Sequence, residues 1–344
     1  MRKKIAWCTL ALITACAPPP VDSVPALGST PGAFVAGAAG HQDDPEFLGR
    51  LTALSTLADL RFAGDSVVAI DNENGRVLIL DSVLNSRGVI GRQGAGPGEL
   101  ENPQELSLWN GMYVVSDAVS QRVTFFRPNG GYAHSVRAPQ GTTSFDLDAR
   151  GTLYLVSCDR THYLDAIPGL GKGARRRMAA RPLDLYGRDD LLKGVPRGLC
   201  AELVVVTRGG EIHVFDNQLG LLTKFDSTGR VLVRRRLPDE HLRNLRQRRR
   251  EIWKDLRRPD ATVPLVKDMT LTPDGQIFLL FNSGTVFGLV VDPSSYTAIP
   301  LHLPSAATDA KPIVTARAAV LGGNAVHLVN EMGYSAHPLR RSGP

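Results

Sequence analysis

Five oxygen-bearing side chains recur at one position of a repeated apolar pattern, and together they could bind a metal ion. Each follows a turn glycine by six or seven residues; the five are Asp71, Asp117, Asp216, Asn282 and Asn330. Carboxylate and amide oxygens suit a hard divalent cation such as calcium, so a broken ring of these side chains is a candidate metal or ligand site. Asp and Asn also commonly cap the turn that leaves a strand, and we favour this structural role.

Two histidines share another position of the same pattern. His213 and His327 stand three residues before the Asp or Asn, where the other copies have Val or Leu. A buried histidine satisfied by a neighbour is therefore expected at both positions, with a ligand role as the alternative. The chain has no His-Glu-x-x-His or Gly-x-Ser-x-Gly stretch, so zinc binding and nucleophilic hydrolysis lack support from motifs.

An arginine-rich segment, residues 234–260, is a candidate surface for an anionic partner. Its apolar residues follow a helical period and Asp239 stands after Pro238 as an N-cap, which predicts an amphipathic helix. Four arginines would stay exposed on this helix: Arg243, Arg246, Arg250 and Arg257. Such a cluster can bind anionic lipid or an acidic polysaccharide. A solvated helix without a ligand is the alternative.

The elements that must position these residues are copies of one β-rich unit. An apolar run, a glycine turn and a second apolar run recur six times, as "LRFAGDSVVAID", "LSLWNGMYVVSD", "FDLDARGTLYLVSC", "LVVVTRGGEIHVFD", "MTLTPDGQIFLLFN" and "AAVLGGNAVHLVN". Six units of about 40 to 50 residues predict an all-β fold, a six-bladed β-propeller of four-stranded blades. The helix would then be an insertion between blades four and five, and residues 159–199 would be another between blades three and four.

The sixth copy lacks a fourth strand, because the sequence ends soon after its third apolar run. A propeller must close its ring, and the β-compatible run at residues 46–54 precedes the first copy. We expect this run to supply the outer strand of the sixth blade, because a missing strand would leave an open sheet edge.

Two cysteines are expected to meet at one end of adjacent blades. Cys158 ends the second strand of the third unit and Cys200 precedes the first strand of the fourth. Export would provide an oxidising setting, so we predict a disulfide between them, with two free buried thiols as the alternative.

Residues 94–131, "GAGPGELENPQELSLWNGMYVVSDAVSQRVTFFRPNGG", carry a family resemblance. The stretch is similar to six-bladed β-propeller proteins related to NHL-repeat domains, in which a Gly-x-Gly-Pro-Gly-Glu loop precedes a strand. The resemblance implies the fold, and many bacterial members are lipoproteins of undetermined function. Related six-bladed lactonases hold a central metal with Glu and Asn ligands, and this sequence does not match that set residue by residue.

The N-terminus predicts export and lipid attachment. Residues 1–15 have a basic start and a short apolar run, and "LITAC" resembles a lipobox in which Cys16 is lipidated and becomes the new N-terminus. An ordinary cleaved signal is the alternative. Ala17 favours the outer over the inner membrane of a bacterial cell envelope. Residues 16–45 are rich in Pro, Ala and Gly and predict a flexible tether, which leaves residues 46–340 for the propeller.

Two functions fit this sequence. The leading hypothesis is a membrane-anchored, non-enzymatic binding or scaffold protein with a ligand or protein partner on the face that carries the crossovers between blades. The alternative is a metal-dependent lactonase or lyase of the six-bladed type. The formal net charge is +6, and it falls to +3 when Arg2, Lys3 and Lys4 are removed with the signal. Because the chain is exported and only mildly basic, no nucleic-acid partner is expected.

Overall fold

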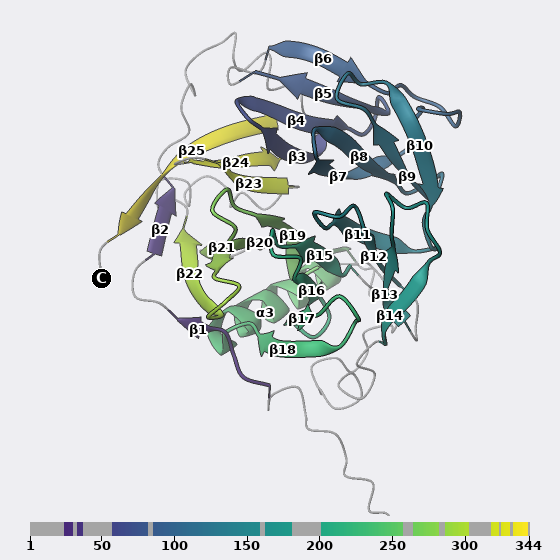
Figure 1. Ribbon diagram of the computed structural model, residues 1–344. Helices are drawn as coiled ribbons and strands as arrows, with labels where there is room; N and C mark the ends of the chain where they lie inside the picture. The colour runs from purple at the N-terminus through teal and green to yellow at the C-terminus, as the bar shows by residue number, and fades with distance from the viewer. Residues whose placement is uncertain are drawn as a thin grey trace, which may run out of the picture.

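The computed structural model describes residues 24–29, 33–36, 57–81, 85–158, 162–180, 201–256, 264–281, 286–302, 318–322, 325–330 and 333–342. It is an all-β propeller, with sheets arranged around a central axis (Figure 1). The predicted all-β class and the four-stranded blade are confirmed.

Four four-stranded sheets follow one another along the chain, and we number them as blades one to four. Each is a meander of antiparallel neighbours whose first strand lies innermost. The strands are β3 (Leu57–Ala63), β4 (Ser66–Asp71), β5 (Arg76–Leu80) and β6 (Ser86–Ile90); β7 (Pro103–Trp109), β8 (Met112–Asp117), β9 (Arg122–Phe126) and β10 (Tyr132–Arg137); β11 (Thr142–Leu147), β12 (Leu153–Ser157), β13 (His162–Ile167) and β14 (Arg176–Ala180); β15 (Leu203–Val206), β16 (Ile212–Asp216), β17 (Leu221–Phe225) and β18 (Val231–Arg236).

The remaining strands form one nine-stranded sheet rather than two separate blades. It contains β19 (Val266–Leu271), β20 (Ile277–Phe281), β21 (Val286–Val291), β22 (Thr297–His302), β23 (Ala318–Gly322), β24 (Ala325–Asn330), β25 (Gly333–Ser342), β2 (Ala33–Ala36) and β1 (Gly28–Ser29). The sheets in the described parts of the chain therefore number five, not the predicted six. The reason is that β2 pairs with β22 on one side and with β25 on the other, which joins the fifth and sixth units.

The strand beside β25 also differs from the predicted one. Residues 46–54 lie outside the described residues, and residues 33–36, which the sequence placed in the tether, form β2 instead. β2 is antiparallel to β25, with Ala33 opposite Ser342. A strand forms here because β22 and β25 supply the hydrogen-bonding partners that local sequence does not reveal.

The arginine-rich segment contains the helix α3 (Asp239–Leu256), which lies between β18 and β19 in the chain. Two acidic residues, Asp239 and Glu240, occupy its first turn, where they complement the positive end of the helix dipole. Within the described residues, no helix is long and apolar enough to span a membrane.

Apolar clusters between successive sheets hold the propeller together. Val114 and Phe125 of blade two pack in one cluster with Phe145 and Leu155 of blade three. A larger cluster joins blade four to β19–β22 and includes Leu242 of α3. β-Branched and aromatic residues suit strands that are buried on both faces. This packing fixes the innermost strands around the channel.

Candidate functional site

Polar side chains of the innermost strands accept hydrogen bonds from backbone N–H groups of the neighbouring blade. Asp59 of β3 accepts a hydrogen bond from the backbone N–H of Leu106 in β7 at 2.7 Å. Glu105 of β7 accepts from the N–H of Phe145 in β11 at 2.8 Å and from the Ser144 hydroxyl at 2.6 Å. An innermost strand presents an unpaired backbone edge to the channel, and buried backbone groups need partners. Asp59 and Glu105 are the hydrogen-bond partners of two such backbone groups.

Blade three continues the same arrangement toward blade four. The Ser144 hydroxyl accepts from the N–H of Val204 at 3.2 Å, and the Asp146 carboxylate accepts from the N–H of Val206 at 2.8 Å. The other Asp146 oxygen accepts from the Ser107 hydroxyl of β7 at 2.9 Å. Polar residues two positions apart on each inner strand thus connect one blade to the next.

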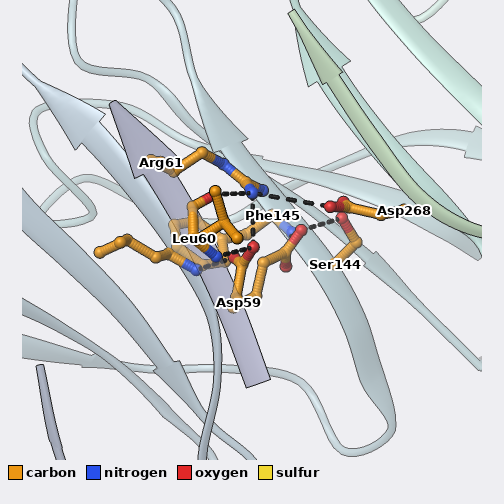
Figure 2. Close-up of polar contacts among 8 residues, drawn as sticks. Asp59, Leu60, Arg61, Ser144, Phe145 and Asp268 are labelled. Atoms are coloured by element: carbon orange, nitrogen blue, oxygen red, sulfur yellow. Dashed lines mark hydrogen bonds and ion pairs between the residues drawn. The ribbon is translucent and has the colours of Figure 1, made fainter. Parts of the chain in front are cut away.

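Arg61 lies at the centre of this network (Figure 2). Its Nη1 donates to Asp59 at 2.5 Å and to the carbonyl of Leu60 at 2.8 Å. The same atom lies 3.7 Å from a carboxylate oxygen of Asp268 in β19, a strand that β23 separates from β3. The Arg61 side chain is only 16% exposed, so this ion pair crosses a largely desolvated channel.

The carboxyl groups around Arg61 hold their protons more tightly than usual. Burial, together with the charge of Asp268, raises the pKa of Asp59 to about 7 against the lowering effect of Arg61. Burial also raises the pKa of Glu105 well above its ordinary value and raises that of Asp146. Burial alone would lower the pKa of Arg61, but the charges of Asp59 and Asp268 raise it, so its guanidinium stays charged.

A cavity of about 470 Å³ opens at the end of the channel where the first strand of each blade turns into the second. We call it the hairpin-end cavity. Arg61, Glu105 and Asp146 line it, together with Thr270 and Arg208. The Thr270 side chain is buried, and its hydroxyl has no hydrogen-bond partner among the described residues. The volume lies within the range of small-molecule sites.

A second cavity, of about 390 Å³, opens at the opposite end, where the crossovers between blades lie. Arg122, Lys267, Gln104 and Gln121 are among the residues that line it.

The glycine-rich loop at residues 91–102 connects β6 to β7, as the resemblance implied. Arg122 donates to the carbonyls of Ala95, Gly96 and Glu99, at 3.0, 3.2 and 2.9 Å. The Glu99 carboxylate accepts from the N–H of Gly96 at 2.8 Å. The loop thus binds its own carboxylate where a phosphate loop would bind an anion.

Two members of the predicted metal ring, Asp117 and Asp216, cap turns in the structure. Asp117 accepts from four backbone N–H groups, those of Glu101, Asn102, Val119 and Ser120. Asp216 accepts from two N–H groups in the turn after β16, and Asp71 pairs with Arg76 at 2.8 Å. Asn282 lies outside the described residues.

Asn330 ends β24, opposite Gly333. The described residues contain no group of three or more His, Cys, Asp or Glu that could hold a metal ion. The capping alternative therefore describes Asp117 and Asp216, while a divalent cation such as calcium at the predicted ring stays a hypothesis.

His213 is buried in the core, as its apolar equivalents suggested, but the hydrogen-bonding neighbour expected for its ring is not found among the described residues. Its side chain is fully buried, and its Nε2 lies 3.8 Å from a carboxylate oxygen of Glu211, beyond hydrogen-bond distance. Burial lowers its pKa to about 4, so the ring is neutral at neutral pH. His327 lies in β24, opposite Val320 of β23.

The cysteine and arginine predictions meet the structure only in part. Cys158 is disulfide-bonded, while its predicted partner Cys200 and the lipidation site Cys16 lie outside the described residues. On α3, Arg243 and Arg250 are exposed as predicted, and Arg257 falls beyond the described residues.

The prediction for Arg246 is wrong, because this side chain is only 9% exposed. It points toward the turn after β16, where its Nη2 lies 3.5 Å from the carbonyl of Leu219. Its position one turn after the buried Leu242 places both on the inward face of the helix.

The channel network was missed by the sequence reasoning. Its signal is an alternation of charged and apolar residues in the first run of several units, as in "LADLRFA" and "VKDMTL". The members differ in type from blade to blade, so no single residue type repeats.

No protein-family model matches the chain, and no curated protein matches it. Solved structures are similar in fold. A candidate exported protein from Bacteroides fragilis matches with a TM-score of 0.54 and 10% identity, over 93% of this chain and 99% of that one. An inactive variant of virginiamycin B lyase from Staphylococcus aureus, with quinupristin, matches with a TM-score of 0.52 and 9% identity, over 82% and 80%.

A gluconolactonase from Xanthomonas campestris also matches, with a TM-score of 0.50 and 13% identity, over 80% of this chain and 82% of that one. At such identities the likeness shows the β-propeller fold alone. The NHL relationship and the lipid anchor stay predictions.

Proposed function

We propose that the protein is a lipid-anchored binding propeller of the bacterial cell envelope, which takes a small polar ligand into the hairpin-end cavity. The observation that carries this proposal is the cavity itself, with Arg61, Glu105 and Asp146 in its lining. Charged side chains are rarely buried without a partner or a role. Here they line a space large enough for a ligand.

The chemistry of the lining favours a neutral ligand that carries hydroxyl and carbonyl groups. The raised pKa values of Glu105 and Asp146 keep protons on these carboxyls at higher pH than usual, which reduces the negative charge that surrounds Arg61. The unpartnered hydroxyl of Thr270 can donate to or accept from a ligand. A sugar or a sugar lactone has hydroxyl and carbonyl groups that match both the Arg61 guanidinium and the Thr270 hydroxyl.

The finer architecture belongs to the same proposal. Six repeat units, closed by β2, would form a six-bladed propeller with α3 as an insertion between blades four and five. A protein or ligand partner on the crossover face, and a divalent cation, are further elements of the sequence-based hypothesis. The predicted export signal supports an envelope location. The similar structure from Bacteroides fragilis, which is described as an exported protein, also supports it.

Binding of defined sugars tests the ligand site. Glucose, gluconate and gluconolactone are titrated calorimetrically into the protein and into Thr270→Val, which removes a hydroxyl that has no described partner. We expect one of the neutral compounds to bind and the variant to bind it about tenfold more weakly. Thr228→Val, on an exposed turn of blade four, is the control. Equal binding by both variants would place the ligand elsewhere.

A second candidate function is a lactonase or lyase. A carboxyl with a raised pKa in a cavity can act as a general acid or base, and Glu105 and Asp146 meet that condition. A lyase and a gluconolactonase share the fold. Hydrolysis of gluconolactone, with and without added calcium, tests it. Activity that survives in Glu105→Gln would exclude this carboxyl as the proton-transfer group.

A further inference from the structure

We propose that the exposed arginines of α3 dock the propeller on an anionic membrane surface, with the crossover end of blade four toward the bilayer. This inference rests on the proposed lipid anchor at Cys16, and it adds an orientation to that anchor. Three structural facts carry it: where the N-terminal segment is fastened, how short the chain before it is, and which face of α3 is exposed.

The N-terminal segment, residues 24–29, is fastened to the end of β18. Leu27 donates its N–H to the carbonyl of Arg236 at 2.8 Å, and Arg236 donates its own N–H to the carbonyl of Pro25 at 3.0 Å. The Arg236 Nε donates to the carbonyl of Val24 at 3.0 Å. Leu27 is only 4% exposed and belongs to the core cluster of blade four. The segment is therefore part of the folded body.

The chain between the anchor and this fastening is short. Cys16 precedes Val24 by eight residues. An extended chain of that length spans at most about 28 Å. A lipid on Cys16 would thus hold the end of β18 within that distance of the bilayer, whatever path the intervening residues take.

The helix α3 begins at the same place. The Arg236 guanidinium also donates to the carboxylate of Asp239, the first residue of α3. Leu242 packs against the turn at Gly220, and Arg246 points at Leu219 in that turn. This turn follows β16, at the crossover end of blade four. The helix is thus fixed at that end, beside the fastened segment (Figure 1).

The outward face of α3 is polar and carries basic side chains. Arg243, Gln247 and Arg250 are exposed and follow one another at intervals of four and three residues, which places them on one side of the helix. The whole helix has six Arg or Lys against four Asp or Glu, and Arg236 pairs with one of those acids. Guanidinium groups bind lipid phosphates well. A leaflet rich in anionic lipid is therefore the matching surface.

Vesicle binding of the unlipidated protein tests the docking surface. The mature chain from Ala17 keeps every described residue and lacks the lipid. We compare it with Arg243→Ser/Arg250→Ser and with the control Arg150→Ser/Arg175→Ser, which removes two exposed arginines from blade three. Vesicles contain phosphatidylcholine alone or with phosphatidylglycerol. We expect binding only to the anionic vesicles, about tenfold to thirtyfold weaker for the α3 variant, and weaker for all proteins as salt increases.

Three outcomes would overturn the proposal. They are equal loss of binding in the α3 and control variants, equal binding to neutral and anionic vesicles, and binding to polygalacturonate, an acidic polysaccharide, without binding to vesicles. The anchor is tested separately by the mass of the N-terminal peptide. An unlipidated peptide with α3-dependent vesicle binding would refute the anchor and leave the docking surface standing. A lipidated peptide, together with equal vesicle binding by the α3 variant and the control variant, would support the anchor and refute the docking surface.

Discussion

Arg61 of β3 and Asp268 of β19 face each other across the channel, with 3.7 Å between Nη1 and Oδ2. Arg61 also pairs with Asp59 on its own strand, and Glu105 and Asp146 lie close enough for their charges to act on it. The guanidinium of Arg61 thus interacts electrostatically with carboxyl groups on four inner strands, β3, β7, β11 and β19.

Removing that guanidinium should destabilise the propeller strongly. We expect Arg61→Gln to lower the free energy of unfolding by about 3 to 5 kcal/mol, because it leaves buried carboxyls without their cation. Urea denaturation measures the change. Arg87→Gln, which breaks an exposed pair with Asp65, should cost less than about 1 kcal/mol. Similar costs for the two variants would contradict a central role for Arg61.

Stability should fall as the pH rises through 7. The pKa of Asp59 is raised from 3.8 to about 7 in the folded state, so its contribution is fully present below pH 3.8 and is lost as the pH passes 7. For this group alone, the expected loss between pH 6 and pH 8 is on the order of 1 kcal/mol. Denaturation at both pH values tests it, and Asp59→Asn should show a smaller loss. An unchanged loss in the variant would assign the effect to another group.

Acid should weaken the protein through His213. Its pKa is lowered from 6.5 to about 4 by burial, so its contribution is fully present above pH 6.5 and declines as the pH falls toward 4. We expect a loss on the order of 2 kcal/mol between pH 7.5 and pH 5. His213→Leu should reduce this loss, because the equivalent positions hold Val or Leu. His134→Leu, in blade two, is the control; a reduction of the same size there would argue against His213.

Cys158 should be bonded to Cys200. The mature, unreduced protein, unfolded in denaturant, is expected to have no thiol that reacts with a maleimide, because Cys16 would carry lipid. Mass spectrometry of the peptides identifies the pair. Loss of the bond, in Cys158→Ser, should cost at most roughly 4 kcal/mol. Two reactive thiols, at Cys158 and Cys200, would contradict the prediction.

The N-terminal strand should be needed for stability. A chain that begins at residue 45 lacks β1 and β2 but keeps residues 46–54, while a chain that begins at residue 24 keeps all the described strands. We expect the shorter chain to melt several degrees lower, because the edges of β22 and β25 lose their partner. Equal melting temperatures would contradict this expectation and would favour the prediction from sequence, that residues 46–54 supply the outer strand of the sixth blade.

Much of the fold could be read from the sequence, because each unit repeats the same alternation and the same glycine turn. The short run "AFVA" could not be identified as β2, since it lies in a stretch rich in Pro, Ala and Gly, and its partners are distant in sequence. The Arg61 network could not be predicted either. Its members are related by position around the channel, and residue type alone does not show that Asp59 and Asp268 approach the same guanidinium.

The pairing of Ala33 with Ser342 also constrains the order of folding. These residues are separated by nearly the whole chain, so the ring cannot close until the last strand has been synthesised. Contacts between such distant residues slow folding, because the entropy of closing the loop must be overcome first. The early blades can form as local meanders, and we expect the pairing of β2 with β25 to be the slow final step of folding.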